Sequence, residues 1–262
     1  MRYMTAVVSS LFVISVLAGP VEKNQRIFNG EVAAPGQFPY LVGLITSIGI
    51  CGGSLISANY VLTAAQCIVE LESVTVVIGS TRIFDQTDEG QIRLKATNLI
   101  VHPGYEIAGE MFDVGLIQLP QSVTNVRPIR LPNLRQAEAT FVGQQATVAG
   151  WGATGQGEPQ SEDLLFVRSA VVSVASCRLS LPTQQITDNH ICANSDSNSP
   201  CKGDYGSPLT IVDVDGITTQ IGVFSLNSVL GCQSNRPAVY SRMSSYLTWI
   251  GDNSDVVIAE DF

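Results

Sequence analysis

The sequence predicts an all-β protein, a sandwich or barrel arrangement in two β units followed by one short helix. Short apolar or alternating segments recur along the chain with turn residues between them, whereas helical periodicity is weak until the C-terminus. A third observation concerns residues 121–144, which contain Pro, Asn and Arg and indicate a connection between two units of roughly 100 residues each.

Each predicted strand is a short apolar or alternating run that ends at a turn signal. In chain order the predicted strands cover residues 40–44, 54–56, 60–64, 74–78, 91–100, 114–119, 145–150, 164–172, 207–212, 218–225 and 238–242. A short helix is expected over 243–251, where Ser244 or Ser245 can serve as the cap of an apolar segment. The tail 252–262 mixes Val and Ile with acidic residues and is predicted to be a loosely ordered terminus.

Composition excludes several classes of protein. The chain has 262 residues, of which 45% are hydrophobic, so it can bury a sizeable core and is not expected to be disordered. Lys and Arg number 14 against 23 Asp and Glu, for a formal net charge of -9. Because binders of phosphate backbones and anionic lipids need clustered cations, we expect no nucleic-acid partner and no membrane surface. We expect the protein to be a monomer.

The N-terminus predicts secretion. Met1 and Arg2 precede an apolar run over residues 4–18 with small residues near its end, which is typical of a signal peptide cleaved near Ala18. The competing interpretation is a membrane anchor, but a run of about 15 residues is short of the roughly 20 that span a bilayer. We therefore predict a signal peptide over 1–18, a short propeptide over 19–26 and an extracellular location.

Six cysteines form an even set suited to three disulfides in an oxidising compartment. They are Cys51, Cys67, Cys177, Cys192, Cys201 and Cys232. Six cysteines allow 15 connectivities, and their spacing does not choose among them. A zinc site is the alternative, but the chain has no C-x-x-C and no pair of His at ligand spacing. We expect no metal and no cofactor.

Four segments occur in an order that carries more information than any one of them. They are RIFNG at 26–30, CGGSL at 51–55 leading to LTAAQC at 62–67, FDVGL at 112–116, and CKGDYGSPL at 201–209. GWG at 150–152 and SSYL at 244–247 support them. Together they resemble the chymotrypsin-like (trypsin-like, S1) serine protease family, and its insect members in particular, over residues 26–250.

The resemblance implies a protease domain over 27–251, built from two packed six-stranded Greek-key β-barrels with the active cleft between them. The first barrel is expected at about 27–125 and the second at about 140–242. The resemblance also implies the disulfides Cys51–Cys67, Cys177–Cys192 and Cys201–Cys232.

The family's chemistry needs a Ser nucleophile, a His base and an Asp that orients the His. By motif, Asp113 holds the Asp position, but Gln66 stands at the His position and Tyr205 at the Ser position. A Gln amide cannot accept a proton near neutral pH, so it cannot be a general base. A phenol with an ordinary pKa of about 10 is ionised to the extent of about one part in a thousand at pH 7.

Either replacement is expected to abolish the reaction, since removing a triad member lowers turnover by about a million-fold. We expect the Tyr205 ring either to occupy the place of a scissile carbonyl or to extend outward into the cleft. Ser207 precedes a proline and has no matching base, and His102 and His190 are expected to be solvated or packed rather than catalytic. Gly203 retains the backbone N–H that would form half of an oxyanion hole.

The specificity pocket is also altered relative to the family. Its base position is Ser199, so no carboxylate is available to pair with a basic side chain. Asn227 and Ala238 stand where the family usually has glycines, and Leu226 stands where it usually has Trp. Side chains in place of glycines should narrow or close the pocket.

Part of the activation machinery is retained. Arg26–Ile27 is a cleavable junction for a trypsin-like protease, and the resemblance implies that the freed amino group of Ile27 pairs with Asp204. Activation by proteolysis and an inherited structural pair without a regulatory role both remain open.

The sequence therefore predicts a secreted serine protease homologue without catalysis. It would act by binding an unidentified protein, either a protease, an inhibitor or a protease substrate, as a decoy, cofactor or regulator. One rival hypothesis is a serine endopeptidase with residual activity. Another is a structural or storage protein with no specific partner.

Overall fold

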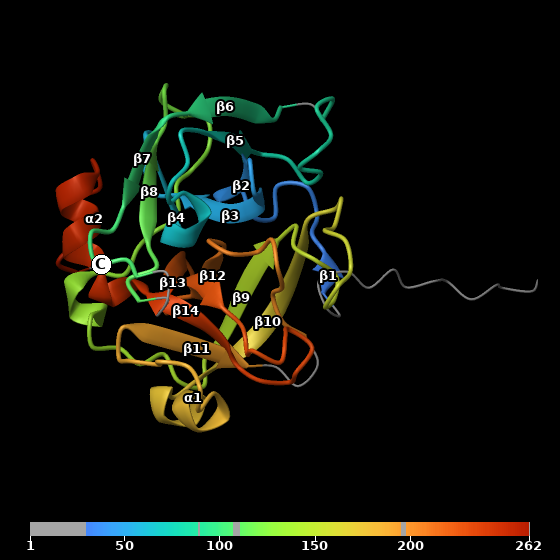
Figure 1. Cartoon of the computed structure of the whole chain (residues 1–262). Helices are drawn as coiled ribbons and strands as arrows, with labels where there is room; N and C mark the ends of the chain where they lie inside the picture. Colours follow the sequence, from blue (N-terminus) through green and yellow to red (C-terminus); the bar gives the residue numbers. More distant parts are fainter. Residues whose placement is uncertain (1–29, 89, 107–110, 195–197, 262) are drawn as a thin grey trace, which may run out of the picture.

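A computed structural model describes residues 30–88, 90–106, 111–194 and 198–261, which form two β-barrels stacked one above the other (Figure 1). The predicted signal peptide, the propeptide and the Arg26–Ile27 junction lie outside the described residues. Within the described ranges, no helix has the length and apolar character that spanning a membrane requires.

The first barrel closes through a bent chain segment that contains β6 and β7. Its strands are β2 (Leu41–Thr46), β3 (Gly49–Leu55), β4 (Tyr60–Thr63), β5 (Val74–Ile78), β6 (Ile92–Ala96), β7 (Asn98–Val101) and β8 (Gly115–Gln118). Their order in the sheet is β6-β5-β2-β3-β4-β8-β7. Strands β6 and β7 are consecutive in the chain, and β6 pairs with β5 while β7 pairs with β8. The predicted run 91–100 thus serves as one bent strand that links the two edges of a six-stranded barrel.

The second barrel is closed directly. It contains β9 (Gln145–Gly150), β10 (Leu165–Val172), β11 (His190–Asn194), β12 (Pro208–Val212), β13 (Thr218–Leu226) and β14 (Ala238–Arg242). These form the ring β10-β11-β14-β13-β12-β9, which closes because β9 also pairs with β10. When β6 and β7 are counted as one strand, each barrel has six strands. Numbered along the chain within each barrel, these strands follow the order 1-2-3-6-5-4 around the ring. The prediction of an all-β fold with two barrels and a short C-terminal helix is confirmed.

Several elements escaped the sequence pattern. Helix α1 (Val174–Ser180) begins at the Ser173 cap but buries only one residue, so it has no apolar stripe to detect. Strand β11 was not predicted, because four consecutive buried residues show no alternation. The C-terminal helix predicted over 243–251 consists of a 3₁₀ turn, η3 (Met243–Ser245), and helix α2 (Leu247–Asn253). Two further 3₁₀ turns are η1 (Ala65–Cys67) and η2 (Leu134–Gln136).

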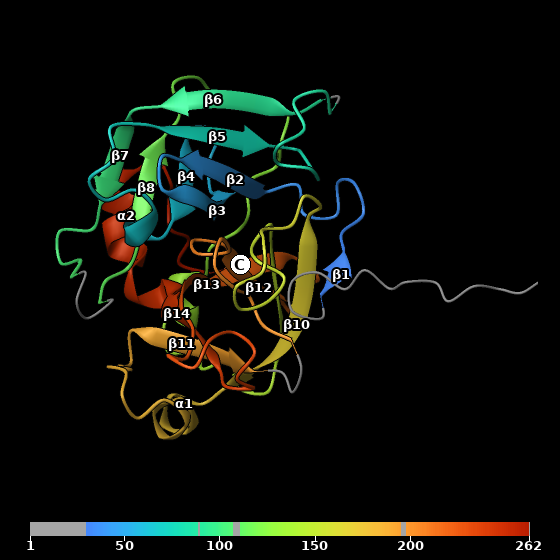
Figure 2. The same ribbon diagram turned by 45° about the vertical axis from the view of Figure 1, so that its right-hand side comes forward.

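Elements near both ends of the described chain cross from one barrel to the other and tie the two barrels together. Strand β1 (Glu31–Val32), within the range predicted for the first barrel, pairs with β10 of the second (Figure 2). Helix α2 follows the second barrel but buries Leu247 and Ile250 in the core of the first. Burying two such side chains contributes about 3–6 kcal/mol. A segment preceding the first barrel thus packs on the second barrel, and a segment following the second barrel packs on the first.

Three disulfides link segments of the two barrels. Cys51 pairs with Cys67, Cys177 with Cys192 and Cys201 with Cys232, so all six cysteines are paired as the family resemblance implies. The first disulfide joins β3 to η1 beside the cleft, and the third joins the loop before Gly203 to the loop after β13.

Candidate active site

Strand pairing brings Gln66 and Asp113 together. Strand β4 runs antiparallel to β8 with Thr63 opposite Gly115. Gln66 lies three residues after Thr63, on η1, and Asp113 lies two residues before Gly115. The two side chains therefore emerge at the same end of this strand pair, next to Ser225 on β13 of the second barrel.

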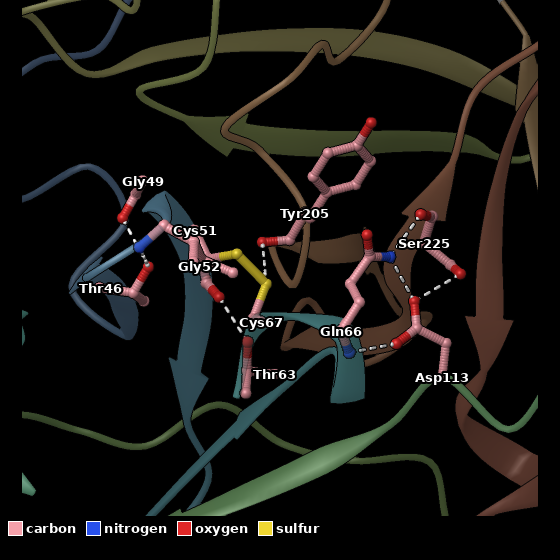
Figure 3. Close-up of a disulfide and its surroundings, with 11 residues drawn as sticks. Thr46, Gly49, Cys51, Gly52, Thr63, Gln66, Cys67, Asp113, Tyr205 and Ser225 are labelled. Atoms are coloured by element: carbon pink, nitrogen blue, oxygen red, sulfur yellow. Dashed lines mark hydrogen bonds between the residues drawn. A yellow bond between two sulfur atoms is a disulfide. The ribbon is translucent and has the colours of Figure 1, made fainter. Parts of the chain in front are cut away.

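The carboxylate of Asp113 is fully buried and is held by hydrogen bonds from both barrels (Figure 3). The backbone N–H of Gln66 donates to Oδ1 over 2.9 Å, and the Gln66 amide Nε2 donates to Oδ2 over 2.6 Å. The hydroxyl of Ser225 donates to Oδ2 over 2.6 Å. Burial raises the pKa of Asp113, and these hydrogen bonds oppose the shift.

Both hydrogens of the Gln66 amide are used. Nε2 donates to Asp113 and also, over 2.8 Å, to the backbone carbonyl of Ser225. Because both of these partners are acceptors, the nitrogen and not the oxygen of the amide must face them. Gln66 thus donates a hydrogen bond to the carboxylate, as the N–H of a histidine would do at this position. It offers no nitrogen lone pair that could take a proton from a nucleophile.

The Tyr205 ring is turned onto the second barrel. It stacks on Phe224 of β13 with ring centres 5.3 Å apart and planes within 7°. Phe224 in turn contacts Tyr240 of β14 at 5.4 Å. Figure 3 shows the ring pointing away from the Asp113 carboxylate, while the Tyr205 carbonyl accepts a hydrogen bond from Gly52 N over 2.7 Å. Instead of extending outward, the half-buried ring packs against the cores of both barrels.

The backbone around Tyr205 retains the shape that its glycines allow. Gly203 has a φ of +102° and Gly206 a φ of +84°, conformations that side chains rarely adopt. A Cβ on Gly206 would lie 2.2 Å from the hydroxyl oxygen of Thr63. Glycine is therefore required at these two positions for the loop to hold this conformation around Tyr205.

Two of the predicted pocket positions, Ser199 and Asn227, lie within hydrogen-bond distance of each other. The hydroxyl of Ser199 lies 3.3 Å from Asn227 Oδ1, and Asn227 Nδ2 donates to the Pro200 carbonyl over 2.8 Å. Ala238 is buried. On the same strand, β14, Tyr240 has a buried hydroxyl without a hydrogen-bond partner in the described part of the chain, and burial raises its pKa. The side chain of Asn227 is thus held against Ser199 and Pro200.

Asp204 is fully buried beside this loop. Its carboxylate accepts hydrogen bonds from Gly152 N over 2.7 Å and from Cys201 N over 2.9 Å. Burial raises the pKa of Asp204 to about 6, since no cation among the described residues forms a salt bridge with it. The expected partner, Ile27, lies outside the described residues.

Both histidines are packed. His102 stacks on Phe112 with ring centres 5.1 Å apart, its Nδ1 accepts from Gly104 N, and burial lowers its pKa. His190 is buried, and its Nδ1 accepts from Thr187 N. Ser207 is also buried, and its hydroxyl has no hydrogen-bond partner in the described ranges.

Three residues of the site were not recognised in these roles from sequence. The sequence placed Ser225 only at the end of the predicted strand 218–225, and its hydroxyl, the one in the run 221–226, was the available signal for a partner of Asp113. The stacking of Phe224 and Tyr240 with Tyr205 depends on tertiary packing, and no local pattern indicated it.

Comparisons with known proteins agree with this geometry. A family model described as "Trypsin" matches residues 27–250. The chain is 34% identical to "Collagenase" of Hypoderma lineatum over 90% of each chain, and 36% identical to "Serine protease 1" of Drosophila melanogaster over 90% of this chain and 89% of that one. The solved structure of HL collagenase matches with a TM-score of 0.79 at 33% identity, covering 88% of this chain and all of that one. The chain therefore belongs to the trypsin-like serine protease family, with homologues in insects.

Proposed function

We propose that this protein is a secreted, non-catalytic member of the trypsin family that acts by binding another protein. The observation that carries the proposal is the Gln66 amide, which stands at the base position and donates both its hydrogens to Asp113 and Ser225. A carboxamide in that arrangement orients the carboxylate partner but cannot accept the proton of a nucleophile.

The position of Tyr205 supports the same proposal. A phenol is a poor nucleophile without a base, and its ring lies on Phe224 instead of beside Gln66 and Asp113. The general base and the serine nucleophile are thus both missing, and restoring one of them alone would not restore the reaction.

The cleft is also poorly suited to an extended peptide. The resemblance implies that substrates pair with residues 225–227, yet the Ser225 carbonyl accepts from Gln66 Nε2 and the Asn227 carbonyl accepts from Gln184 Nε2. A substrate or an inhibitor that enters as a strand would have to displace both side chains. Among the possible partners, this disfavours inhibitors that insert a side chain into the pocket.

Secretion is supported by chemistry as well as by the apolar N-terminus. All six cysteines are paired, and disulfides persist in oxidising compartments. Secretion would place the protein among active proteases, their inhibitors and their substrates, any of which could be its partner.

A fluorophosphonate probe tests the proposal, because it labels serine nucleophiles activated by a general base. Protein cleaved after Arg26 is incubated with the probe beside an active trypsin-family protease as the positive control. We expect no labelling of this protein under conditions that label the control completely. Stoichiometric labelling would overturn the proposal.

A residual endopeptidase activity is the second candidate, and two observations favour it. The named relatives are proteases, and this chain keeps a buried Asp113 and a glycine at position 203. Enzymes without a complete triad keep about 10³ to 10⁴ over the uncatalysed rate. This candidate predicts slow peptide hydrolysis that falls further when Asp113 is changed to Asn.

A further inference from the structure

A large groove lies away from the degenerate triad, at the junction of the two barrels. Its volume is about 1040 Å³, and its lining includes none of the triad, pocket or activation positions. One wall comes from the first barrel and the connection, through Phe38, Pro39 and Pro128. The other wall is the tip of the β12–β13 hairpin, residues 212–218. Ligand sites occur preferentially at such junctions.

The groove has an apolar floor whose polar atoms are already satisfied. Tyr40 and Ile211 are buried there. The hydroxyl of Tyr40 hydrogen-bonds the side chain of Thr210, and the Thr210 hydroxyl donates to the Thr147 carbonyl over 3.1 Å. Because the hydroxyls of Tyr40 and Thr210 already have partners, apolar side chains gain most from burial against this part of the groove.

The hairpin presents apolar side chains to solvent at the groove. Val212 is 68% exposed, Ile217 37% exposed, and Val214 is fully exposed. These three residues line the groove together. An apolar patch at the rim of a cavity is typical of an interaction site, whereas isolated exposed apolar residues are ordinary.

Ion pairs hold this hairpin in place. Arg130 contacts Asp213 over 3.2 Å and Asp215 over 2.5 Å, and its Nε donates to the Thr219 hydroxyl over 2.8 Å. Since Arg130 belongs to the connection between the barrels, these contacts fix the hairpin against the opposite wall. The groove is therefore preformed, and a ligand need not order the hairpin when it binds.

Arg127 supplies an uncommitted positive charge in the groove. Every other arginine in the described ranges donates to a carboxylate or a carbonyl, and Arg127 alone has no such partner there. Among the described residues that line the groove, Asp213 is the one acidic residue, and Arg130 pairs with it and with Asp215. Arg127 is therefore the cation of the groove that is available to a carboxylate of a ligand.

We propose that the groove binds an extended acidic and apolar segment of a partner protein. Apolar side chains of the segment lie between Pro128 and the hairpin, and a carboxylate pairs with Arg127. A second copy of this chain fits less well, because a twofold contact through the groove would bring two Arg127 side chains of like charge into one interface. The groove shares no residue with the triad, so the proposal stands whether or not the triad is active.

A displayed library of random 12-residue peptides is the probe. Selection against the full secreted protein is expected to enrich peptides that combine Asp or Glu with large apolar residues. Affinity for an enriched peptide should fall at least tenfold in Arg127→Glu and in Val214→Asp, and it should fall on raising the salt concentration. Thermal melting checks that each variant is folded, and Arg127→Gln provides a milder variant.

Matched control variants make the same kinds of substitution, apolar to acidic and basic to acidic, at positions outside the groove. Leu179→Asp alters an apolar side chain that is 83% exposed, and Lys95→Glu reverses an exposed charge, both outside the groove. Both should leave the affinity within twofold of the original. The proposal is overturned if no peptide is enriched, if enriched peptides lack acidic residues, or if the groove variants bind as well as the controls. A dimer that Val214→Asp dissolves would overturn it in favour of a second copy.

Discussion

Replacing Gln66 with Glu changes the amide nitrogen Nε2, a hydrogen-bond donor, into a carboxylate oxygen, an acceptor, and leaves the size of the side chain the same. In the native protein the Gln66 Nε2 donates to the buried Asp113 Oδ2 over 2.6 Å and to the Ser225 carbonyl over 2.8 Å. In Gln66→Glu an oxygen stands in that place and faces two acceptors. At neutral pH two carboxylates would then share one buried site.

The expected cost follows from those contacts. A hydrogen bond to a charged group contributes about 1.5–3 kcal/mol and a neutral one about 0.5–1.5 kcal/mol. The like charge beside a fully buried carboxylate adds to this loss, so we expect the free energy of unfolding to fall by about 3–5 kcal/mol at pH 7.5. The loss should depend on pH, since the repulsion raises the folded-state pKa of the carboxyl pair above the unfolded value of about 4. The repulsion is therefore absent well below pH 4 and complete above the raised folded-state pKa, whereas the loss of one hydrogen bond remains at both pH values, because a protonated carboxyl has one O–H where the Gln66 amide donates twice.

Urea unfolding followed by tryptophan fluorescence measures this at pH 7.5 and at pH 4. Gln66→His is the matched control, because an imidazole N–H can still donate to Asp113, and its stability should remain within about 1 kcal/mol of the original. If Gln66→Glu were as stable as Gln66→His at pH 7.5, the reasoning that Gln66 serves as an obligatory donor would be wrong.

Three further predictions concern the ring, the buried carboxyl and the triad. Tyr205→Ala should lose about 2 kcal/mol of stability in urea unfolding and open a cavity beside Phe224 that binds indole, measured by calorimetry. In uncleaved protein, burial of Asp204 with a pKa of about 6 should lower the free energy of unfolding by about 2 kcal/mol as the pH rises from 4 to 7, and cleavage after Arg26 should remove this loss. Gln66→His combined with Tyr205→Ser should recover weak hydrolysis of ester substrates at best, because the pocket is changed too.

Each of these has a contradicting outcome. Indole binding of equal strength to the unchanged protein would mean that the ring does not fill the site. For Asp204, the sign follows from a folded-state pKa above the unfolded one, so that stability is greatest below pH 4; a pH dependence that cleavage leaves unchanged would remove Ile27 as its partner. Robust trypsin-like turnover in the double variant would show that Ser199 and Asn227 do not close the pocket.

Sequence reasoning recovered the fold because two kinds of signal agreed. The apolar runs predicted most strands, and the run 91–100 was correctly placed although it bends between β6 and β7. The three disulfide pairs came from the family resemblance, since spacing alone left 15 possibilities. Strand β11 and helix α1 were missed because neither shows a periodic apolar pattern.

At the site, sequence named the residues but not their arrangement. Motif order placed Gln66 and Asp113, whose contact follows from the pairing of β4 with β8. The orientation of Tyr205 could not be predicted, because it depends on the flat face of Phe224, which strand β13 of the same barrel presents to it. The groove at Arg127 likewise depends on two distant segments meeting at the junction of the barrels, and no local pattern marks it.

Peptide cleavage by the mature protein tests the central claim most directly. Protein cleaved after Arg26 is incubated with a diverse peptide mixture, and new termini are counted by mass spectrometry beside an Asp113→Asn variant prepared in the same way. Because Gln66 cannot accept a proton, the account predicts the same background cleavage from both proteins. Cleavage at defined peptide bonds by the original protein that disappears in the Asp113→Asn variant would contradict it.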